Sequence, residues 1–255
     1  MKVYNKLISG RSFTVLAVLA IIGVAGLVGG CVTINPGNLT TEEHREDRAL
    51  QPAATNIILN VSTVNGNVEI RELAGASNVE VTFDVFATEG HLLHVLTGTN
   101  GTRVDNNTVM IEASAKVNKE YQNEIATHGA NIIVTVPQGS HYELNLNTVN
   151  GDVTVPALNG GSLIAGTVNG KVDITAGNFT AIDARSTNGD VIVKLPAGTL
   201  FYVDATTVNG RVRHGSIHMA PVTENDHTLV GPTEAGSGSL RMMLRAVNGK
   251  IEISY

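Results

Sequence analysis

Three stretches of the chain, LNLNTVNGDVTV (144–155), LIAGTVNGKVDI (163–174) and IDARSTNGDVIV (182–193), carry one pattern at a constant spacing. Each stretch holds an Asn-Gly pair near its centre, at 150, 169 and 188, so the pattern returns after 19 residues. Apolar residues alternate with polar ones on both sides of the pair. A fixed period of this kind is typical of repeat folds, in which each repeat is one structural unit. The sequence therefore predicts a stack of similar coils.

The same pair recurs outside these stretches, in the strings VSTVNGNVEI, ATTVNGRVRH and RAVNGKIEI. The step from 188 to 209 is 21 residues, and the step from 209 to 248 is 39, which is close to two periods. The predicted corner residues are Asn65, Gly66, Asn150, Gly151, Asn169, Gly170, Asn188, Gly189, Asn209, Gly210, Asn248 and Gly249. We predict that they form one structural turn ladder and not six hairpins, because hairpins would not need the same residue at the same depth each time.

Alternation with a period of two predicts β-strands that bury one face on each side of the corner. If each period is one coil, successive coils stack as parallel strands about 4.8 Å apart. A Gly after each Asn suits a corner that needs a positive φ. We therefore expect an all-β fold, a right-handed parallel β-solenoid with about 19–21 residues per coil. The domain is expected to cover 57–255, with regular coils over 143–255.

Residues 57–142 depart from the period after the first corner, and we expect them to form an irregular N-terminal layer that caps the stack. Such caps protect the open sheet edges of solenoids. Alternation predicts strands in this layer over 79–87, 109–115 and 132–136. The pair Asn100-Gly101 is interpreted as a turn. Near the other end of the domain, 218–238 is interpreted as a degenerate coil or a protruding loop.

The first 31 residues have the features of an export signal. A basic head precedes a run from 12 to 30 that carries no charge, and Cys31 follows directly. Cys31 is the single Cys of the chain and resembles the lipid-attachment site of prokaryotic lipoproteins, which implies lipid attachment there. The alternative is an uncleaved transmembrane helix, because about twenty apolar residues span a bilayer. Both interpretations predict a hydrophobic signal or anchor helix and a membrane-anchored, extracytoplasmic chain at the cell surface or periplasmic face.

Residues 32–56 are interpreted as a polar linker between anchor and domain. They contain Pro36 and Pro52 and show no sustained hydrophobic period. Residues 41–50 are also able to form a short helix, with Thr40 or Thr41 as its cap.

Composition limits the function classes. The formal net charge is −6 and the pI is about 5.7. Nucleic-acid binding needs a basic face, so no nucleic-acid partner is expected. Aromatic residues make up only 4% of the chain, whereas sugar-binding grooves normally use aromatic platforms. No Gly-x-Ser-x-Gly elbow places a nucleophile. These features argue against an enzyme.

Two sets of side chains are candidates for chemistry. Metal ligands could come from His91, His94, His214 and His218, but no acidic or Cys partner stands at a convincing spacing. Glycoside hydrolysis could use a pair of outward carboxylates from Asp152, Asp173, Asp183, Asp190 and Asp204. Most of these carboxylates fall in repeat columns beside Lys or Arg, which indicates solvated structural charge. We therefore expect no cofactor, no metal and no catalytic residue.

The string Val-Asn-Gly-Asn-Val-Glu-Ile at 64–70, the Val-Pro at 136–137 and the later Thr-Val-Asn-Gly coils resemble the putative-adhesin β-solenoid family, a prokaryotic domain of unknown function. The resemblance implies a solenoid in a cell-surface setting and carries over no catalytic residue. We expect a non-enzymatic, membrane-anchored surface protein, adhesin-like or structural in the envelope, with an extracellular protein or polysaccharide as its partner. The alternatives are a carbohydrate-active β-helix enzyme and an envelope sensor domain.

Overall fold

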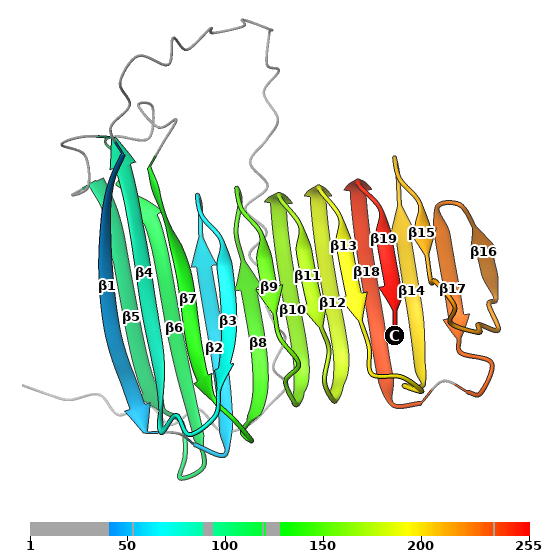
Figure 1. The fold of residues 1–255 in the computed structure, drawn as a ribbon, viewed down its shortest axis with the longest axis horizontal. Helices are drawn as coiled ribbons and strands as arrows, with labels where there is room; N and C mark the ends of the chain where they lie inside the picture. The colour runs from blue at the N-terminus through cyan, green and yellow to red at the C-terminus, as the bar shows by residue number, and fades with distance from the viewer. Residues whose placement is uncertain (1–40, 53, 89–93, 119, 121–127, 237) are drawn as a thin grey trace, which may run out of the picture. The chain divides into compact units, whose positions relative to one another are not determined.

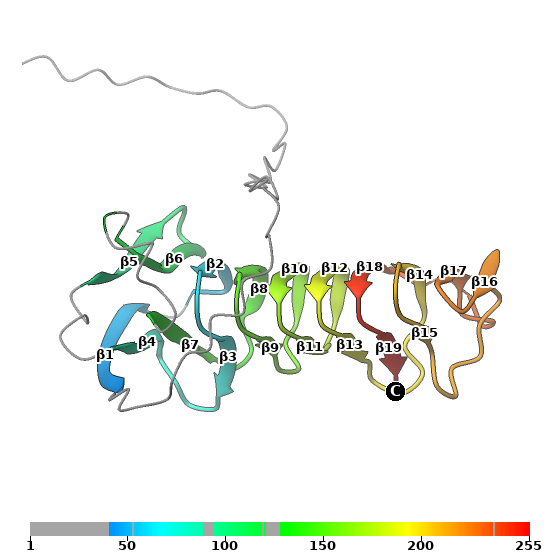
Figure 2. The same cartoon turned by 90° about the horizontal axis from the view of Figure 1, so that it is seen from above.

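The computed structural model describes residues 41–52, 54–88, 94–118, 120, 128–236 and 238–255, all within one compact unit, 38–255. Two β-sheets face each other in this unit (Figures 1 and 2). The nine-stranded sheet has the order β1 (Thr41–Pro52), β4 (Asn78–Thr88), β7 (Gly129–Pro137), β3 (Val68–Leu73), β9 (Val153–Val155), β11 (Val172–Thr175), β13 (Val191–Lys194), β19 (Ile251–Ser254) and β15 (Val212–Arg213). The ten-stranded sheet has the order β16 (Thr223–Asn225), β17 (Thr228–Pro232), β14 (Phe201–Thr207), β18 (Leu240–Asn248), β12 (Phe179–Asn188), β10 (Gly160–Asn169), β8 (His141–Asn147), β2 (Asn56–Thr63), β6 (Thr108–Val117) and β5 (Val95–Arg103).

Each Asn-Gly corner joins a strand of the ten-stranded sheet to a strand of the nine-stranded sheet. We name each coil by its corner Asn. The Asn169 coil, for example, is β10 followed by β11, and both strands pair in parallel with β12 and β13 of the Asn188 coil. Residues 169 and 188 stand opposite each other in this register. The predicted all-β stack of parallel coils is confirmed, and no α-helix occurs in the described ranges. The right hand of the winding stays a prediction.

The core lies between the two sheets and consists of aliphatic columns. The columns on the ten-stranded sheet stand six and four residues before each corner Asn, and those on the nine-stranded sheet stand three and five residues after it. The first of these columns is Leu59, Leu144, Leu163, Ile182, Met242 and Val203, and all six side chains are buried. Stacking gives such a side chain in an inner coil an aliphatic neighbour in the coil on either side, so burial continues along the stack. One buried aliphatic side chain contributes about 1.5–3 kcal/mol. The few such side chains of a single coil do not offset the conformational entropy lost when its backbone is ordered, so one coil alone is not stable.

The stacking order differs from the chain order at the C-terminal end. β18 and β19 of the Asn248 coil lie between the Asn188 coil and the Asn209 coil. The Asn209 coil is therefore the terminal one, and its inner positions fit that place. Val212 is only partly buried, and His214 stands where the other coils have Val or Ile. A coil with fewer buried aliphatic side chains loses less burial free energy by lying at the end of the stack, where one of its faces has no further coil to cover it.

The interpretation of 218–238 as a degenerate coil or protruding loop is wrong. Part of this segment forms the hairpin β16–β17, and β17 pairs antiparallel with the outer edge of β14. The hairpin covers the backbone N–H and C=O groups that a terminal parallel strand would otherwise expose.

The interpretation of 57–142 as irregular also needs correction. The strands predicted over 79–87, 109–115 and 132–136 are present as parts of β4, β6 and β7. β6 and β7 pair in parallel with β2 and β3, so they add a further coil to the stack. The pair Asn100-Gly101 lies inside β5 and is not a turn. β4 and β5 run antiparallel to β7 and β6 and extend each sheet beyond this coil.

The expected short helix over 41–50 is wrong. Residues 41–52 form strand β1, which pairs antiparallel with β4 from Thr41 opposite Thr88 to Pro52 opposite Asn78. Glu, Arg, Ala and Leu give this segment a helical composition, but the free edge of β4 offers it a complete row of backbone partners. Tertiary context therefore overrides local propensity.

The corner glycines are required by close stacking. A Cβ on Gly151 would lie 2.1 Å from the carbonyl oxygen of Gly66, and a Cβ on Gly189 would lie 2.0 Å from that of Gly170. The glycines at 66, 170, 210 and 249 face the same obstacle, at 1.9 to 2.1 Å from a backbone oxygen of the neighbouring coil. A positive φ, the reason expected from the sequence, applies at Gly66, Gly151, Gly170 and Gly189, where φ lies between 133° and 157°, but not at Gly210 or Gly249. Backbone contact between coils is thus the more general reason for Gly.

The same glycine carbonyls accept hydrogen bonds from a column of buried hydroxyls. Thr148 Oγ1 donates to Gly66 O and Thr167 Oγ1 donates to Gly151 O, both at 2.8 Å. Ser186 and Thr207 repeat the bond at the same distance, to Gly170 O and Gly249 O. The Asn248 coil has Ala246 at this position, so its side chain cannot donate to Gly189 O. The corner therefore lacks one hydroxyl in an otherwise regular column.

Gly249→Ala is expected to lower the free energy of unfolding by about 3 kcal/mol, because its Cβ would lie 2.0 Å from the carbonyl oxygen of Gly189 and force two coils apart. Gly98→Ala is the matched control, since its Cβ would meet nothing closer than 3.9 Å. The control should leave stability unchanged or raise it by about 0.4–1 kcal/mol. Denaturant unfolding of both full-length variants measures the difference, and equal effects would contradict the close-stacking argument.

Ala246→Ser is expected to raise the free energy of unfolding by about 1 kcal/mol, because the new hydroxyl completes the column beside Gly189 O. Ser186→Ala is the reciprocal change and should lower it by about 1 kcal/mol. Thermal and denaturant unfolding would measure both. A destabilising Ala246→Ser would show that this corner has no room for the bond.

Candidate functional site

The six corner Asn side chains form one hydrogen-bonded ladder. Asn150 Nδ2 donates to Asn65 Oδ1 at 2.6 Å, and Asn169 Nδ2 donates to Asn150 Oδ1 at 2.7 Å. The bonds from Asn188 to Asn169, from Asn248 to Asn188 and from Asn209 to Asn248 follow at 2.7 to 2.8 Å. Asn65 Nδ2 ends the ladder on the carbonyl oxygen of His128, at 2.7 Å. Every amide points the same way, so each bond polarises the next.

This ladder joins coils to one another. Its bonds run between neighbouring coils, as stacked Asn side chains do in cross-β structures. It shows that the Asn248 coil lies between the Asn188 and Asn209 coils, since its amide bonds to both.

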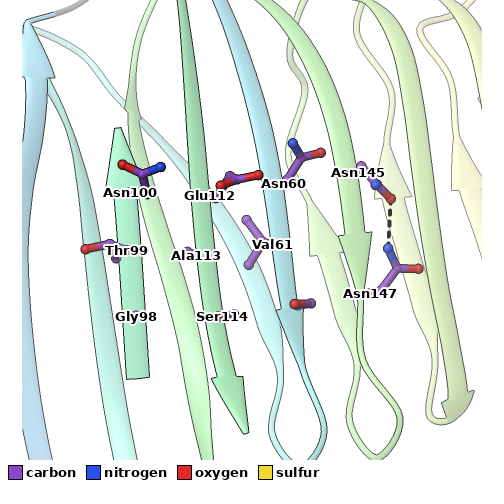
Figure 3. Close-up of a pocket in the computed structure, with 11 residues that line it drawn as sticks. Asn60, Val61, Gly98, Thr99, Asn100, Glu112, Ala113, Ser114, Asn145 and Asn147 are labelled. Atoms are coloured by element: carbon purple, nitrogen blue, oxygen red, sulfur yellow. Dashed lines mark hydrogen bonds between the residues drawn. The ribbon is translucent and has the colours of Figure 1, made fainter. Parts of the chain in front are cut away.

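The candidate site is a polar groove on the outer face of the ten-stranded sheet, across β5, β6, β2 and β8 (Figure 3). Its volume is about 490 Å³, which is within the range of small-molecule sites. The strand registers arrange most of its side chains in two rows. The first row is Asn100, Glu112, Asn60 and Asn145, and the second row is Gly98, Ser114, Ser62 and Asn147.

The groove is made of amides and hydroxyls. Asn147 Nδ2 donates to Asn145 Oδ1 at 2.8 Å, which fixes these two amides relative to each other. Glu112 is the one ionisable residue among the lining residues, and its side chain is exposed. The apolar lining residues Val61 and Ala113 are buried in the sheet beneath. The groove is therefore a neutral-to-acidic surface rich in paired hydrogen-bond donors and acceptors.

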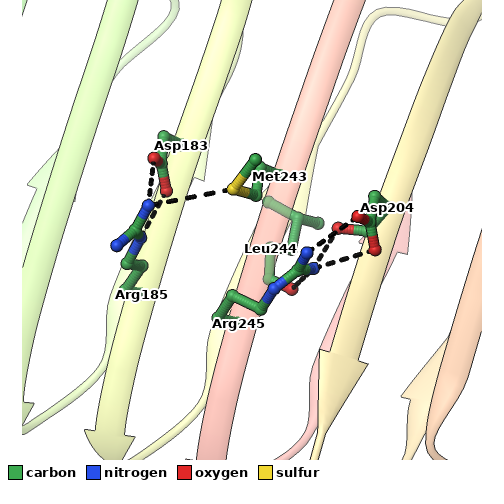
Figure 4. A network of polar contacts seen from close by, with 6 residues as sticks. All are labelled: Asp183, Arg185, Asp204, Met243, Leu244 and Arg245. Atoms are coloured by element: carbon green, nitrogen blue, oxygen red, sulfur yellow. Dashed lines mark hydrogen bonds and ion pairs between the residues drawn. The ribbon is translucent and has the colours of Figure 1, made fainter.

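The same two rows carry ion pairs farther along the sheet (Figure 4). Arg185 binds both carboxylate oxygens of Asp183, at 2.8 and 2.7 Å. The hydrogen bond to Asp183 raises the pKa of Arg185. Arg245 on β18 reaches across to β14 and binds both carboxylate oxygens of Asp204, at 3.0 and 2.8 Å. This half of the outer face is thus charged but internally neutralised, unlike the groove.

The five carboxylates considered for glycoside hydrolysis all have structural partners. Asp183 and Asp204 are held by arginines, and Asp173 lies 2.8 Å from Lys171 Nζ and 3.6 Å from Lys194 Nζ. Asp152 and Asp190 accept backbone N–H bonds from Lys171 and Lys250, at 2.7 and 2.9 Å. None of the five lines the groove.

The histidines are dispersed. His214 contacts the Ile217 carbonyl oxygen and Glu224 Oε1, at 2.9 and 3.1 Å. His94 stacks on the buried ring of His128, with ring centroids 6.2 Å apart. His218 is exposed, and His91 lies outside the described residues. Within the ranges that the structure describes, no three His, Cys, Asp or Glu residues are placed to hold a metal.

The predicted signal or anchor and Cys31 lie outside the described residues, so lipid attachment stays a prediction. Among the residues that the structure describes, no helix has the length and hydrophobicity needed to cross a membrane.

A solved structure with a similar fold is that of a putative cell adhesion protein from Clostridium sporogenes ATCC 15579. The two chains are 17% identical and have a TM-score of 0.63, over 84% of this chain and 99% of that one. A putative adhesin from Bacteroides fragilis NCTC 9343 aligns over 84% of this chain and 98% of its own, at 11% identity and a TM-score of 0.30. None of the curated protein sequences is significantly similar to this chain. At such identity, the Clostridium structure supports the fold and nothing finer.

A family model supports the relationship more directly. The model described as Toastrack DUF4097 matches residues 52–254, from the last residue of β1 to the end of β19. This span includes every Asn-Gly corner, the antiparallel strands β4 and β5, and the groove. The family resemblance seen in the sequence is confirmed, and the chain belongs to the Toastrack DUF4097 family.

Proposed function

We propose that this chain is a non-enzymatic, adhesin-like surface protein. In this proposal it is tethered outside the cytoplasm through lipid on Cys31 and presents the outer face of its ten-stranded sheet to an extracellular partner. The observation that carries the proposal is the polar groove across β5, β6, β2 and β8, which lies on this outer face.

The state of the charged side chains supports a binding role over a hydrolytic one. A glycosidase needs two carboxylates across a cleft, one of them able to give up a proton. Asp183 and Asp204 are each held by an Arg in a two-bond pair, and the groove contributes only Glu112 as a carboxylate. The groove is therefore better suited to hold a ligand than to cleave one.

The comparison with known structures agrees with this proposal. The Clostridium protein that shares the fold is named for cell adhesion. The export signal in 1–31 would place this chain where such a role is possible. A stack of backbone-bonded coils also gives the groove a rigid support, which lowers the entropy lost on binding.

The tether is tested by Cys31→Ala in a prokaryotic host. The wild-type chain should carry the added mass of a lipid and partition with membranes. The variant should lack the lipid mass and be released, because one thiol carries the whole attachment. Val24→Ile, an apolar change in the same run, is the control and should behave as wild type. A wild-type chain that carries no lipid mass and keeps its full N-terminus would show that the segment is a transmembrane anchor.

Surface presentation is tested separately, by protease treatment of intact cells. Loss of the solenoid from wild-type cells, with cytoplasmic proteins untouched, is the expected result. A chain that is degraded only after the envelope is opened would contradict a surface-presented adhesin.

A further inference from the structure

The groove has a specific shape that follows from small residues in its second row. Gly98, Ser114 and Ser62 stand side by side across β5, β6 and β2. Asn100 and Glu112, one row away, carry longer side chains on the same strands. Four strands at about 4.8 Å spacing make the groove about 14 Å long in the direction of the stack. An extended ligand would thus cross the strands and touch the same two rows at each of them.

The lining residues exclude several ligand classes. None of the eleven is Lys, Arg or His, so a phosphate, a nucleic acid or an acidic polysaccharide would find no counter-charge. Val61 and Ala113, the apolar members, are 1% exposed, so a lipid tail would find almost no apolar surface. Four Asn side chains, the Ser62 and Ser114 hydroxyls and Glu112 remain as the principal contact groups on the outer face.

These groups suit a ligand that has many neutral hydroxyls. An Asn amide carries one acceptor oxygen and two donor hydrogens, so it can bind two neighbouring hydroxyls of a sugar ring at once. Glu112 adds an acceptor that can take a hydroxyl proton in a charge-assisted bond. The bond between Asn147 and Asn145 holds two of the amides in a fixed orientation before any ligand arrives.

We propose that the groove binds a neutral polysaccharide, with the sugar chain lying along the two rows from β5 to β8. The proposal rests on the surface role proposed above, and it names the class of partner. Without an aromatic platform, each site binds weakly. Many copies on one cell, each engaging the same polymer, would raise the overall avidity without any new contact.

An extended peptide is the main competing ligand, and the geometry disfavours it. A peptide normally adds to an exposed strand edge, where its backbone continues the ladder. The groove lies on the face of the sheet, where β6, β2 and β8 are paired on both sides and, of these four described strands, only β5 has an unpaired outer edge. A peptide there would leave its own backbone groups poorly satisfied.

The test measures retention of the full-length chain, held in neutral detergent micelles, on beads that carry a neutral glucan, a neutral mannan or an anionic polygalacturonate. Retention on at least one neutral polymer, reversed by the free neutral polymer and absent on polygalacturonate, is expected. Asn60→Ala removes a central amide and should lower retention about five-fold, the effect of about 1 kcal/mol. Ser114→Lys should abolish it, because a long side chain would fill the groove.

Two controls separate loss of binding from loss of fold. Asn178→Ala repeats the loss of an amide, and Thr175→Lys also replaces a hydroxyl residue by Lys. Both positions are exposed and do not line the groove, so both variants should be retained as wild type. Unfolding transitions of all four variants should match. Retention that survives Ser114→Lys, or that is equal on the anionic beads, would overturn the proposal.

The outcome also separates this proposal from the broader one. A chain that is lipidated and exposed on cells but binds neither neutral polymer would refute the polysaccharide site and leave the surface role intact. A chain that binds a neutral polymer through the groove but stays inside the cell would refute the surface role and leave the site intact.

Discussion

Backbone contact at the Asn-Gly corner is the constraint on which the rest of the stack depends. There each glycine lies so close to the preceding coil that a Cβ would come within about 2 Å of a carbonyl oxygen. At four corners the glycine carbonyl oxygen also accepts a hydrogen bond from a buried Thr or Ser hydroxyl of the neighbouring coil. The Asn before each glycine donates its side-chain amide to the corner Asn of the neighbouring coil, as Asn150 and Asn169 do. One column of backbone contacts and two columns of hydrogen bonds therefore meet at one corner. Since all three repeat at the strand spacing, this corner fixes the register of both sheets at once.

Uniform columns make the coils nearly interchangeable, and this explains why their order could not be read from the sequence. Asn188 and Asn209 are separated by about one period, which favours direct stacking of their coils. In the structure the Asn248 coil lies between them. Its Asn, Gly and inner aliphatic residues match those of both neighbouring coils, so it can stack on either one. What distinguishes the Asn209 coil is its poor inner face, with Val212 half-buried and His214 in an aliphatic column. This weak inner face is visible in the sequence, but it predicts a terminal position only once the stacking of the coils is known.

The sequence predicted the period, the corner residues, the buried columns and the family. These features depend on local patterns that repeat, so each copy strengthens the inference from the others. The failures fall where the chain stops repeating. Residues 41–50 have a helical composition and become a strand only because β4 offers an edge. Asn100-Gly101 has the composition of a turn, yet it lies within β5 because β6 provides an antiparallel partner. Pairing between distant segments decides both cases.

The groove arises from this same break in the repeat, which gives a physical reason for its position. In the regular part of the stack the same two rows carry Asp183, Arg185, Asp204 and Arg245, whose side chains pair with one another (Figure 4). At the groove, β5 departs from the parallel stack through its antiparallel course and contributes Gly98, which has no side chain. The sequence feature that could have predicted the groove is a difference between coils in their outward-facing residues. Positions with amide and hydroxyl residues on β2 and β8 carry Asp and Arg on β12. In a repeat protein, departure from the column is the better indicator of a binding surface, because the column itself is already explained by stacking.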